Sequence, residues 1–257
     1  MRIVVCVKPV PLTARLDERT ARIVRVGPTG LNPVDENAIE TALQIRESGG
    51  GGEVILLALS TPEAAGALRP GLAMGADRAV VIAGPEFAGS DLLGTSLALA
   101  TAAQMLAPDL LVFGSSSSDG NGAMLWSAVA ERLSLPVVSR AVEVIVDLCR
   151  LTATRQLEYG LDVVEVELPA VLALSGEINV PRYPSFKDVI GAKKKVISVL
   201  TIGTGLELDP ANVGSRGART TVLSAEEPPR RSKGVVVHDE GNTLEQLVTF
   251  LRARRLL

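Results

Sequence analysis

Short apolar runs alternate with longer amphipathic stretches along the first half of the chain. The apolar runs are rich in Val, Ile and Leu and predict buried strands at residues 2–7, 53–59, 78–83 and 109–113. Apolar residues spaced three and four positions apart predict helices at about 35–47, 61–76, 90–106 and 123–133. Strands that alternate with helices in this way are typical of a parallel, doubly wound sheet.

Polar residues at the predicted helix starts indicate N-caps. Asp35 is expected to cap the first helix, and Thr61, followed by Pro62, the second. Pro70 must kink or shorten that second helix because proline lacks an N–H and clashes with the preceding turn. Asp91 is expected to cap the third helix.

The pattern changes after Pro136. Residues 137–146, 150–157 and 163–168 are predicted to be extended, and residues 169–175 form a further buried strand.

Beyond about residue 200, glycine and proline become frequent and the residue patterns typical of helices and strands weaken. An amphipathic helix is then predicted at 242–254. A long, weakly structured stretch that ends in a helix is unusual inside a compact domain. We therefore expect a Rossmann-like domain at 1–200 and an extended C-terminal arm at 201–257 that wraps a partner.

Composition narrows the function. The formal net charge is −3 and aromatic residues make up only 3% of the chain, which argues against nucleic-acid binding. Cys6 and Cys149 are expected to be small core residues, and with His238 as the single histidine there is no pattern for a metal site or a catalytic triad. No apolar stretch has the length of a membrane span and no disulfide framework is visible, so we expect a cytoplasmic protein with no membrane insertion.

The most informative candidate site is the loop after the fourth strand. Four serines and the sequence Asp-Gly-Asn-Gly follow the strand and lead into a helix, so the loop offers small side chains, hydroxyls and backbone N–H groups. Such a loop suits a phosphate at a helix N-terminus, but it matches no standard nucleotide motif and could equally be an ordinary turn.

Other strand ends carry polar residues as well. Ser60 and Asp91 are first of all helix caps, although the Asp91 carboxylate could accept a ribose hydroxyl. Asn32 and Asp35 could bond an adenine edge, or could simply form a turn and a cap. No acid, base or nucleophile is assembled by a motif, so the residues alone indicate an α/β protein with a nucleotide phosphate loop and no catalytic apparatus.

Several motifs resemble the electron-transfer flavoprotein beta subunits, also called the FixA type. The matching blocks are Leu168-Pro169-Ala170-Val171, Ile178-Asn179-Val180-Pro181-Arg182-Tyr183-Pro184-Ser185-Phe186, Ala192-Lys193-Lys194-Lys195, Val5-Cys6-Val7-Lys8-Pro9-Val10-Pro11, Asn32-Pro33 with Asp35-Glu36, Ala73-Met74-Gly75-Ala76-Asp77 and Asp119-Gly120. Their order and spacing cover nearly the whole chain.

The resemblance implies an adenine nucleotide alpha hydrolase-like fold and a heterodimer with an FAD-carrying alpha subunit. It implies electron carriage from dehydrogenases, or from NADH, through flavin to a quinone oxidoreductase or a similar acceptor. The implied cofactor-binding residues are Cys6, Asn32, Asp35, Ser60, Asp91, Thr95, Gly114, Ser115, Ser118, Asp119, Gly120, Asn121, Gly122, Ala123, Met124 and Leu125. The implied partner-docking residues are Pro184, Ser185, Phe186, Lys193, Lys194 and Lys195.

The resemblance does not decide whether the nucleotide bound by this chain is AMP or a second FAD. Residues 123–125 read Ala-Met-Leu where many members have Gln-Thr-Gly or Gln-Val-Gly, so backbone contacts must hold the phosphates. Thr13 stands where AMP-type members often have a Tyr. The block from Phe87 to Asp91, together with Thr95, resembles bifurcating and FixA-like members and favours FAD.

Two other classes of function remain. A stand-alone adenine-nucleotide sensor of the universal-stress-protein type would share the fold but would not need the arm. An adenylating enzyme would need a pyrophosphate loop of Ser-Gly-Gly character and a catalytic Lys, and residues 114–122 have neither.

Overall fold

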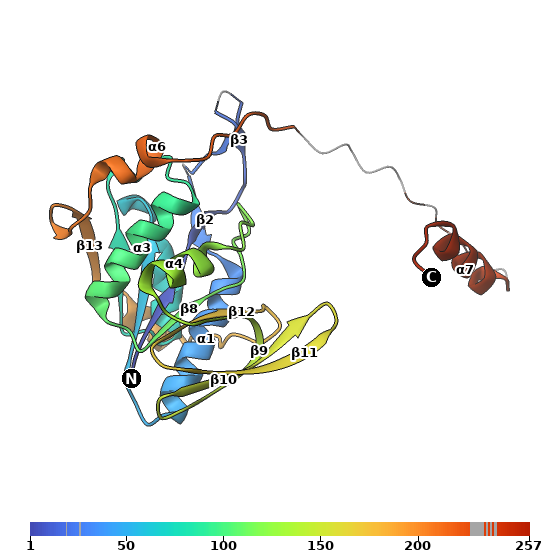
Figure 1. Ribbon diagram of the computed structural model, residues 1–257, viewed down its shortest axis with the longest axis horizontal. Coiled ribbons are helices and arrows are strands. Elements are labelled where there is room, and N and C mark those ends of the chain that lie inside the picture. The colour runs from blue at the N-terminus through green and yellow to red at the C-terminus, as the bar shows by residue number, and fades with distance from the viewer. Residues whose placement is uncertain (19, 26, 227–233, 235, 237, 239–240) are drawn as a thin grey trace. The chain divides into compact units, whose positions relative to one another are not determined.

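The computed structural model describes residues 1–18, 20–25, 27–226, 234, 236, 238 and 241–257 (Figure 1). The chain divides into two units, Met1–Leu223 and Ser224–Leu257. Strand β13, Ile197–Ile202, runs through residue 200, and the first unit continues to Leu223.

In the described part of the chain, ten strands form one sheet in the order β11-β10-β9-β12-β8-β1-β6-β7-β13-β14. Every pairing is parallel except those of β10 with β9 and β11. The bounds are β1 Arg2–Cys6, β6 Glu53–Leu59, β7 Arg78–Ile82, β8 Leu110–Phe113, β9 Val137–Asp147, β10 Arg150–Leu157, β11 Gly160–Glu167, β12 Ala170–Leu174, β13 Ile197–Ile202 and β14 Gly205–Leu206.

Two small antiparallel pairs lie outside this sheet, and both belong to the excursion that follows β1. They are β2 Pro9–Pro11 with β5 Thr29–Leu31, and β3 Leu16–Asp17 with β4 Arg22–Ile23.

Helices bury both faces of the parallel sheet. In β1, Ile3 and Val5 join the cluster under helix α1, whereas Val4 and Cys6 join the cluster under helix α3. Successive side chains of a strand point to opposite faces, so a strand covered on both sides must be apolar throughout. The first face carries α1 Pro33–Ser48, the 3₁₀ helix η1 Pro62–Leu68 and α2 Arg69–Met74, and the second carries α3 Leu92–Leu106 and α4 Leu125–Leu133. This is the α/β, doubly wound architecture expected from the sequence.

The remaining helices are short, apart from α7. They are η2 Pro85–Phe87, α5 Phe186–Ala192, η3 Pro210–Asn212, α6 Gly214–Gly217 and α7 Thr243–Ala253. Helix α7 belongs to the second unit and exposes Leu244 and Leu247. None of the described helices combines the length and the apolarity that a membrane crossing requires.

The helix starts differ in part from expectation. Asp91 caps α3, since its carboxylate accepts the N–H groups of Leu93 and Gly94. Asp35, however, is not the cap of α1: the helix begins at Pro33, which suits a first turn because its missing N–H would be unpaired there anyway. The N-cap position is Asn32, and Asp35 lies inside the first turn. Pro70 marks the junction between η1 and α2.

Cys149 corrects another expectation. We expected a core residue, but Cys149 is exposed in the turn between β9 and β10. These antiparallel strands alternate between more buried and more exposed residues, so they are not covered on both sides like the parallel strands.

Candidate functional site

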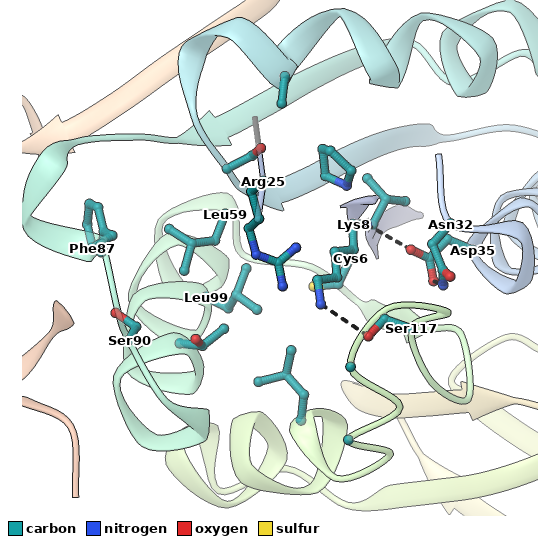
Figure 2. Close-up of a pocket in the computed structure, with 18 of the residues that line it drawn as sticks. Cys6, Lys8, Arg25, Asn32, Asp35, Leu59, Phe87, Ser90, Leu99 and Ser117 are labelled. Carbon is teal, nitrogen blue, oxygen red and sulfur yellow. Dashed lines mark hydrogen bonds between the residues drawn. The ribbon is translucent and has the colours of Figure 1, made fainter. Parts of the chain in front are cut away.

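A cavity of about 860 Å³ opens at the carboxyl ends of the parallel strands (Figure 2). Its walls come from the segments after β1, β6, β7 and β8 and from the starts of α3 and α4. The strand order reverses between β1 and β8, because the chain proceeds from β1 to β6 on one side and places β8 on the other. Ligands of doubly wound proteins bind at such a switch point.

Gly114, the first residue after β8, lies against the first turn of α1. A Cβ placed on Gly114 would be 2.6 Å from Asp35 Oδ1 and 3.1 Å from the backbone of Val34. Only a residue without a side chain allows the β8 loop to approach the helix this closely. The loop and the helix N-terminus are therefore joined at the floor of the cavity.

Asn32 and Asp35 form the polar centre of this junction. Asn32 Nδ2 donates to Asp35 Oδ1 (3.0 Å) and to the carbonyl of Ser116 (2.9 Å), and Asn32 Oδ1 accepts the N–H of Ser118 (2.9 Å). Asp35 Oδ2 accepts the backbone N–H of Lys8 (2.7 Å). The side chain of Asn32 thus holds in place the loop after β8, which is the candidate phosphate-binding loop.

Burial dominates the electrostatics of this centre. Loss of hydration raises the pKa of Asp35 to about 7, although the hydrogen bonds from Asn32 and Lys8 oppose the rise. The neighbouring Cys6 thiol is also buried, and burial together with the Asp35 charge raises its pKa well above the ordinary value. Cys6 is therefore held as a neutral thiol.

Three charged side chains meet beside the loop. Lys8 Nζ donates to Ser117 Oγ (3.1 Å) and to Asp119 Oδ1 (2.6 Å), and Arg25 Nη1 donates to Asp119 Oδ2 (2.5 Å). Burial alone would raise the pKa of Asp119, but the hydrogen bonds from Lys8 and Ser117 outweigh it and leave the pKa at about 2. Burial lowers the pKa of Lys8, whereas the hydrogen bond to Asp119 and the negative charge of Asp119 act in the opposite direction.

The other end of the cavity is apolar. Leu59, Phe87 and Leu99 line it together with Ser90 (Figure 2). Ser60, the residue after Leu59, also lines the cavity. One cavity therefore offers a charged, hydrogen-bonding end and an apolar end, a combination common in sites for cofactors.

Asp91 lies at this apolar end, but its carboxylate is already bonded. Oδ1 caps α3, and Oδ2 accepts the backbone N–H groups of Arg219 (2.7 Å) and Thr220 (3.1 Å). A ribose hydroxyl would have to compete with these donors. Thr95 lies one helical turn further along α3 and also lines the cavity.

Most of the expected cofactor residues meet at this cavity. Its lining includes Cys6, Asn32, Asp35, Ser60, Asp91, Thr95, Gly114, Ser115, Gly120, Gly122, Ala123, Met124 and Leu125. Ser118, Asp119 and Asn121 are not part of the lining, although Ser118 and Asp119 brace it through the bonds to Asn32, Lys8 and Arg25.

Sequence reasoning missed several lining residues. Lys8, Arg25, Leu99 and Trp126 were not chosen as site residues, yet all line the cavity. Phe87, which belongs to the block that the resemblance relates to flavin binding, lines it as well. Lys8 carried a usable signal, because it directly follows the first strand at the edge where the ligand is expected. Arg25 carried none, because it belongs to the irregular excursion between β4 and β5.

Part of the backbone in the loop that follows β8 is free to donate hydrogen bonds to a ligand. Within the described residues, the N–H groups of Gly120, Gly122 and Ala123 make no hydrogen bond, and all three residues line the cavity. Free backbone N–H groups on a turn of this kind fit an anion such as a phosphate. Among the described residues, no three His, Cys, Asp or Glu side chains gather to hold a metal ion.

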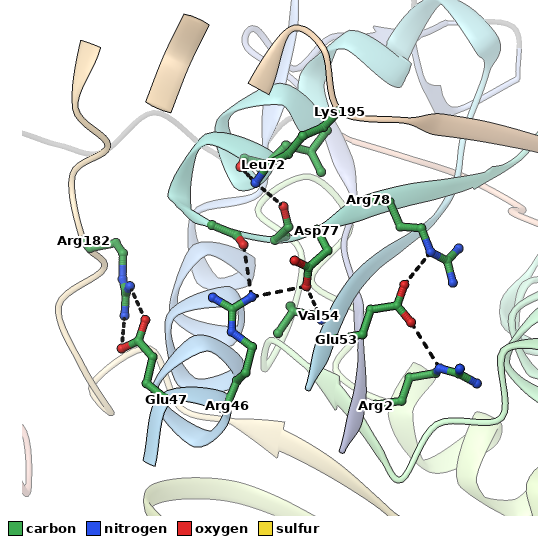
Figure 3. A network of polar contacts seen from close by, with 12 residues as sticks. Arg2, Arg46, Glu47, Glu53, Val54, Leu72, Asp77, Arg78, Arg182 and Lys195 are labelled. Carbon is green, nitrogen blue, oxygen red and sulfur yellow. Dashed lines mark hydrogen bonds and ion pairs between the residues drawn. The ribbon is translucent and has the colours of Figure 1, made fainter. Parts of the chain in front are cut away.

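The expected docking residues lie on a separate segment. Ser185 caps α5 with a reciprocal capping box to Asp188, and Phe186 projects from the helix start with 81% of its surface exposed. Before the helix, Arg182 forms paired hydrogen bonds to Glu40 and to Glu47 on α1. Figure 3 shows the pair with Glu47. These bonds raise the pKa of Arg182 and fix the segment to α1.

The three lysines after α5 have different surroundings. Lys193 and Lys194 are exposed, but Lys195 Nζ donates to the carbonyls of Leu72 (2.9 Å) and Ala76 (2.6 Å) at the end of α2. In return, Arg69 of α2 donates to the carbonyls of Ala192 (2.5 Å) and Lys195 (2.8 Å). Lys195 therefore anchors the segment, and its ammonium is not available to a partner in the way that we expected.

Fold and site together define a Rossmann-like α/β protein with a cofactor-sized cavity at its switch point. Residues 20–203 match the family model described as "Electron transfer flavoprotein domain". The chain is 36% identical to the electron transfer flavoprotein subunit beta of Thermoanaerobacterium thermosaccharolyticum, with 100% of both chains covered. The corresponding subunit of Mycobacterium tuberculosis is 37% identical over 88% of this chain and 87% of its own.

A third relative has a more specific name. The caffeyl-CoA reductase-Etf complex subunit CarD of Acetobacterium woodii is 34% identical, again with 100% of both chains covered. The chain belongs to the electron transfer flavoprotein family and corresponds to its beta subunits. Proteins of this family transfer electrons, and their beta subunits pair with an alpha subunit.

Proposed function

We propose that this chain forms a heterodimer with an FAD-carrying alpha subunit and holds an adenine nucleotide, FAD, in the cavity described above. The heterodimer carries electrons from a dehydrogenase, or from NADH, to a quinone oxidoreductase or a similar acceptor. The flavin supplies the redox chemistry, and this chain supplies binding, orientation and a docking segment.

The observation that carries the choice of FAD is the two-ended cavity. Its volume of about 860 Å³ lies near the upper limit of the range of roughly 300–1,000 Å³ for small-molecule sites. A mononucleotide has one ring system and one phosphate, so its ring can occupy either the apolar end at Leu59, Phe87 and Leu99 or the polar end, but not both. A dinucleotide with a second ring system uses both ends. AMP is the alternative occupant.

The residues that would hold the nucleotide follow from the lining. Gly120, Gly122 and Ala123 offer free backbone N–H groups for phosphate, and Ser60 also lines the cavity. No described side chain needs to act as an acid, a base or a nucleophile. The relation to CarD, whose name places it in a reductase complex, agrees with a carrier that meets dehydrogenase-type partners.

The test is the nucleotide content of the purified heterodimer. The chain is co-expressed with its alpha-type subunit, and the nucleotides are released and quantified by chromatography. Two FAD per heterodimer support the proposal, whereas one FAD and one AMP assign AMP to this chain. The alpha subunit purified alone is the control, because its own nucleotide content shows which nucleotide of the heterodimer belongs to this chain. A monomer with ATP and no flavin refutes the proposal in favour of a nucleotide sensor.

A further inference from the structure

Two cations from separate parts of the chain meet at one buried carboxylate beside the cavity. Lys8 follows β1 and Arg25 follows β4, and both bond to Asp119 in the β8 loop. Only 2% of the Asp119 side chain is exposed, whereas Lys8 and Arg25 are 36% and 47% exposed and both line the cavity. Figure 2 shows the ammonium and the guanidinium directed into the same open space.

The two cations have donors left after these bonds. A lysine ammonium carries three N–H donors and an arginine guanidinium five. In the described structure, Lys8 uses two, for Ser117 and Asp119, and Arg25 uses one. The remaining donors lie beside a cavity whose neighbouring N–H groups, those of Gly120 and Gly122, are also free.

The charges do not cancel at this place. Asp119 contributes one negative charge and the two cations contribute two positive charges, so these three side chains together carry a positive excess, which Asp35 on the same cavity reduces when it is ionised. A single cation would be enough to neutralise a buried Asp119, and the second therefore needs another explanation. An anion bound between the two cations would complete the arrangement with charge-assisted hydrogen bonds, which are stronger than neutral ones.

We infer that Lys8 and Arg25 form a cation pair that binds the phosphate or diphosphate group of the nucleotide, and that Asp119 is the positioning residue that holds both cations in place. The two oxygens of Asp119 have separate tasks, since Oδ1 accepts from Lys8 and Oδ2 from Arg25. The cation pair has a use only if the cavity binds a nucleotide, so it rests on the proposed function.

Titration of the full-length, nucleotide-free chain with adenosine, AMP, ADP and inorganic pyrophosphate tests the cation pair. In the wild type, each added phosphate tightens binding, and salt weakens ADP binding more than adenosine binding. Lys8→Met and Arg25→Met each weaken ADP binding by about ten- to a hundred-fold, the range for a hydrogen bond to a charged group. Adenosine binding stays within about two-fold in both variants.

Asp119→Asn separates positioning from overall charge. This variant raises the net positive charge of the wall, so a purely electrostatic role predicts tighter ADP binding. Positioning predicts weaker ADP binding, because the cations lose the oxygens that hold them. Lys8→Arg keeps the charge and restores binding relative to Lys8→Met. Lys187→Met removes an exposed lysine on α5 and is the matched control, with unchanged ADP affinity.

The outcomes are distinguishable. If the wild type binds adenosine but gains nothing from AMP, ADP or pyrophosphate, the cation pair is refuted and the nucleotide site stands. If adenosine and ADP weaken equally in the Lys8→Met, Arg25→Met and Asp119→Asn variants, these residues serve the fold alone. If the wild type binds none of the probes, the proposed function fails as well.

Discussion

The carboxylate of Asp91 joins the start of α3 to the backbone of Arg219. Its Oδ1 caps the helix, while its Oδ2 accepts the Arg219 N–H at 2.7 Å from a residue 128 positions later in the chain. Ser90 adds a second link, since its Oγ accepts the N–H of Gly214 at 2.7 Å. The wall of the cavity and residues 213–220 are therefore joined by hydrogen bonds.

Asp91→Ala is expected to release this segment. The variant loses the cap and two backbone acceptor contacts, for a cost of about 1–3 kcal/mol in the free energy of unfolding. Hydrogen–deuterium exchange should rise in residues 213–220 and at the start of α3 together. Asp147→Ala, at an exposed position at the end of β9, is the control. Faster exchange at α3 without a change in 213–220 contradicts the link.

Gly114→Ala should destabilise the protein without changing any charge. The new Cβ meets Asp35 Oδ1 at 2.6 Å and rigid backbone at 3.1 Å, so the β8 loop must move away from α1. We expect a loss of about 1–3 kcal/mol in denaturant unfolding, the usual cost of overpacking. Gly122→Ala is the matched control, because nothing lies within 4 Å of its Cβ. Equal stability of the two variants would contradict the close packing.

Asp35 should make stability depend on pH. Its pKa is raised from 3.8 to about 7 in the folded chain, so between these values the folded state binds more protons than the unfolded state. The contribution of Asp35 to stability is therefore full below about pH 4 and is lost as the pH rises to about 7.

The variant Asp35→Asn isolates this contribution. Urea unfolding of wild type and variant from pH 4.5 to 8 should show the wild type losing stability relative to the variant, by up to about 1.4 kcal/mol per pH unit. Asp119 does not interfere, because its lowered pKa of about 2 confines its effect to more acidic solution. A stability difference that is constant across this range would show that Asp35 is ionised throughout.

Phe186→Ala should slow electron delivery by the partner dehydrogenase. The ring is exposed at the start of α5, outside the residues that line the cavity. Loss of an aromatic anchor from a docking site typically costs about 1–2 kcal/mol, or roughly ten-fold in the second-order rate of reduction. Nucleotide content should stay unchanged.

The control for Phe186→Ala is Tyr159→Ala. Tyr159 is equally exposed at 81% but lies in the turn between β10 and β11. Stopped-flow reduction of the intact heterodimer measures both variants. Unchanged kinetics for Phe186→Ala, or an equal loss in both variants, removes the docking role.

The sequence predicted the parallel sheet well because residues such as Val4 and Val5 are buried on opposite faces, which leaves an apolar run without alternation. The β8 loop was found for a similarly local reason, its serines and glycines. Lys8, Arg25 and Asp119 were not recognised as a group, because Asp119 lies 111 and 94 positions from its partners. Contacts between such distant residues are set by the topology of the sheet and leave no local pattern.

The surroundings of Lys195 differ from the expectation for a related reason. Three lysines in a row indicate a solvated patch, and two of them are exposed, but the third reaches carbonyls at the end of α2. Only the pairing of β13 with β7 brings that end within reach.

The reciprocal bonds between Arg69 and the carbonyls at the end of α5, and between Lys195 and the carbonyls at the end of α2, have an evolutionary consequence. They hold the docking segment by its main chain at one end, while Arg182 holds it at the other. The exposed side chains between Phe186 and Lys194, apart from Asp188 of the capping box, can then be exchanged without disturbing either anchor, whereas Ala192 is buried. If this stretch docks electron donors as proposed, a lineage could acquire a new donor by changing these residues, while the residues that line the cavity are inherited unaltered.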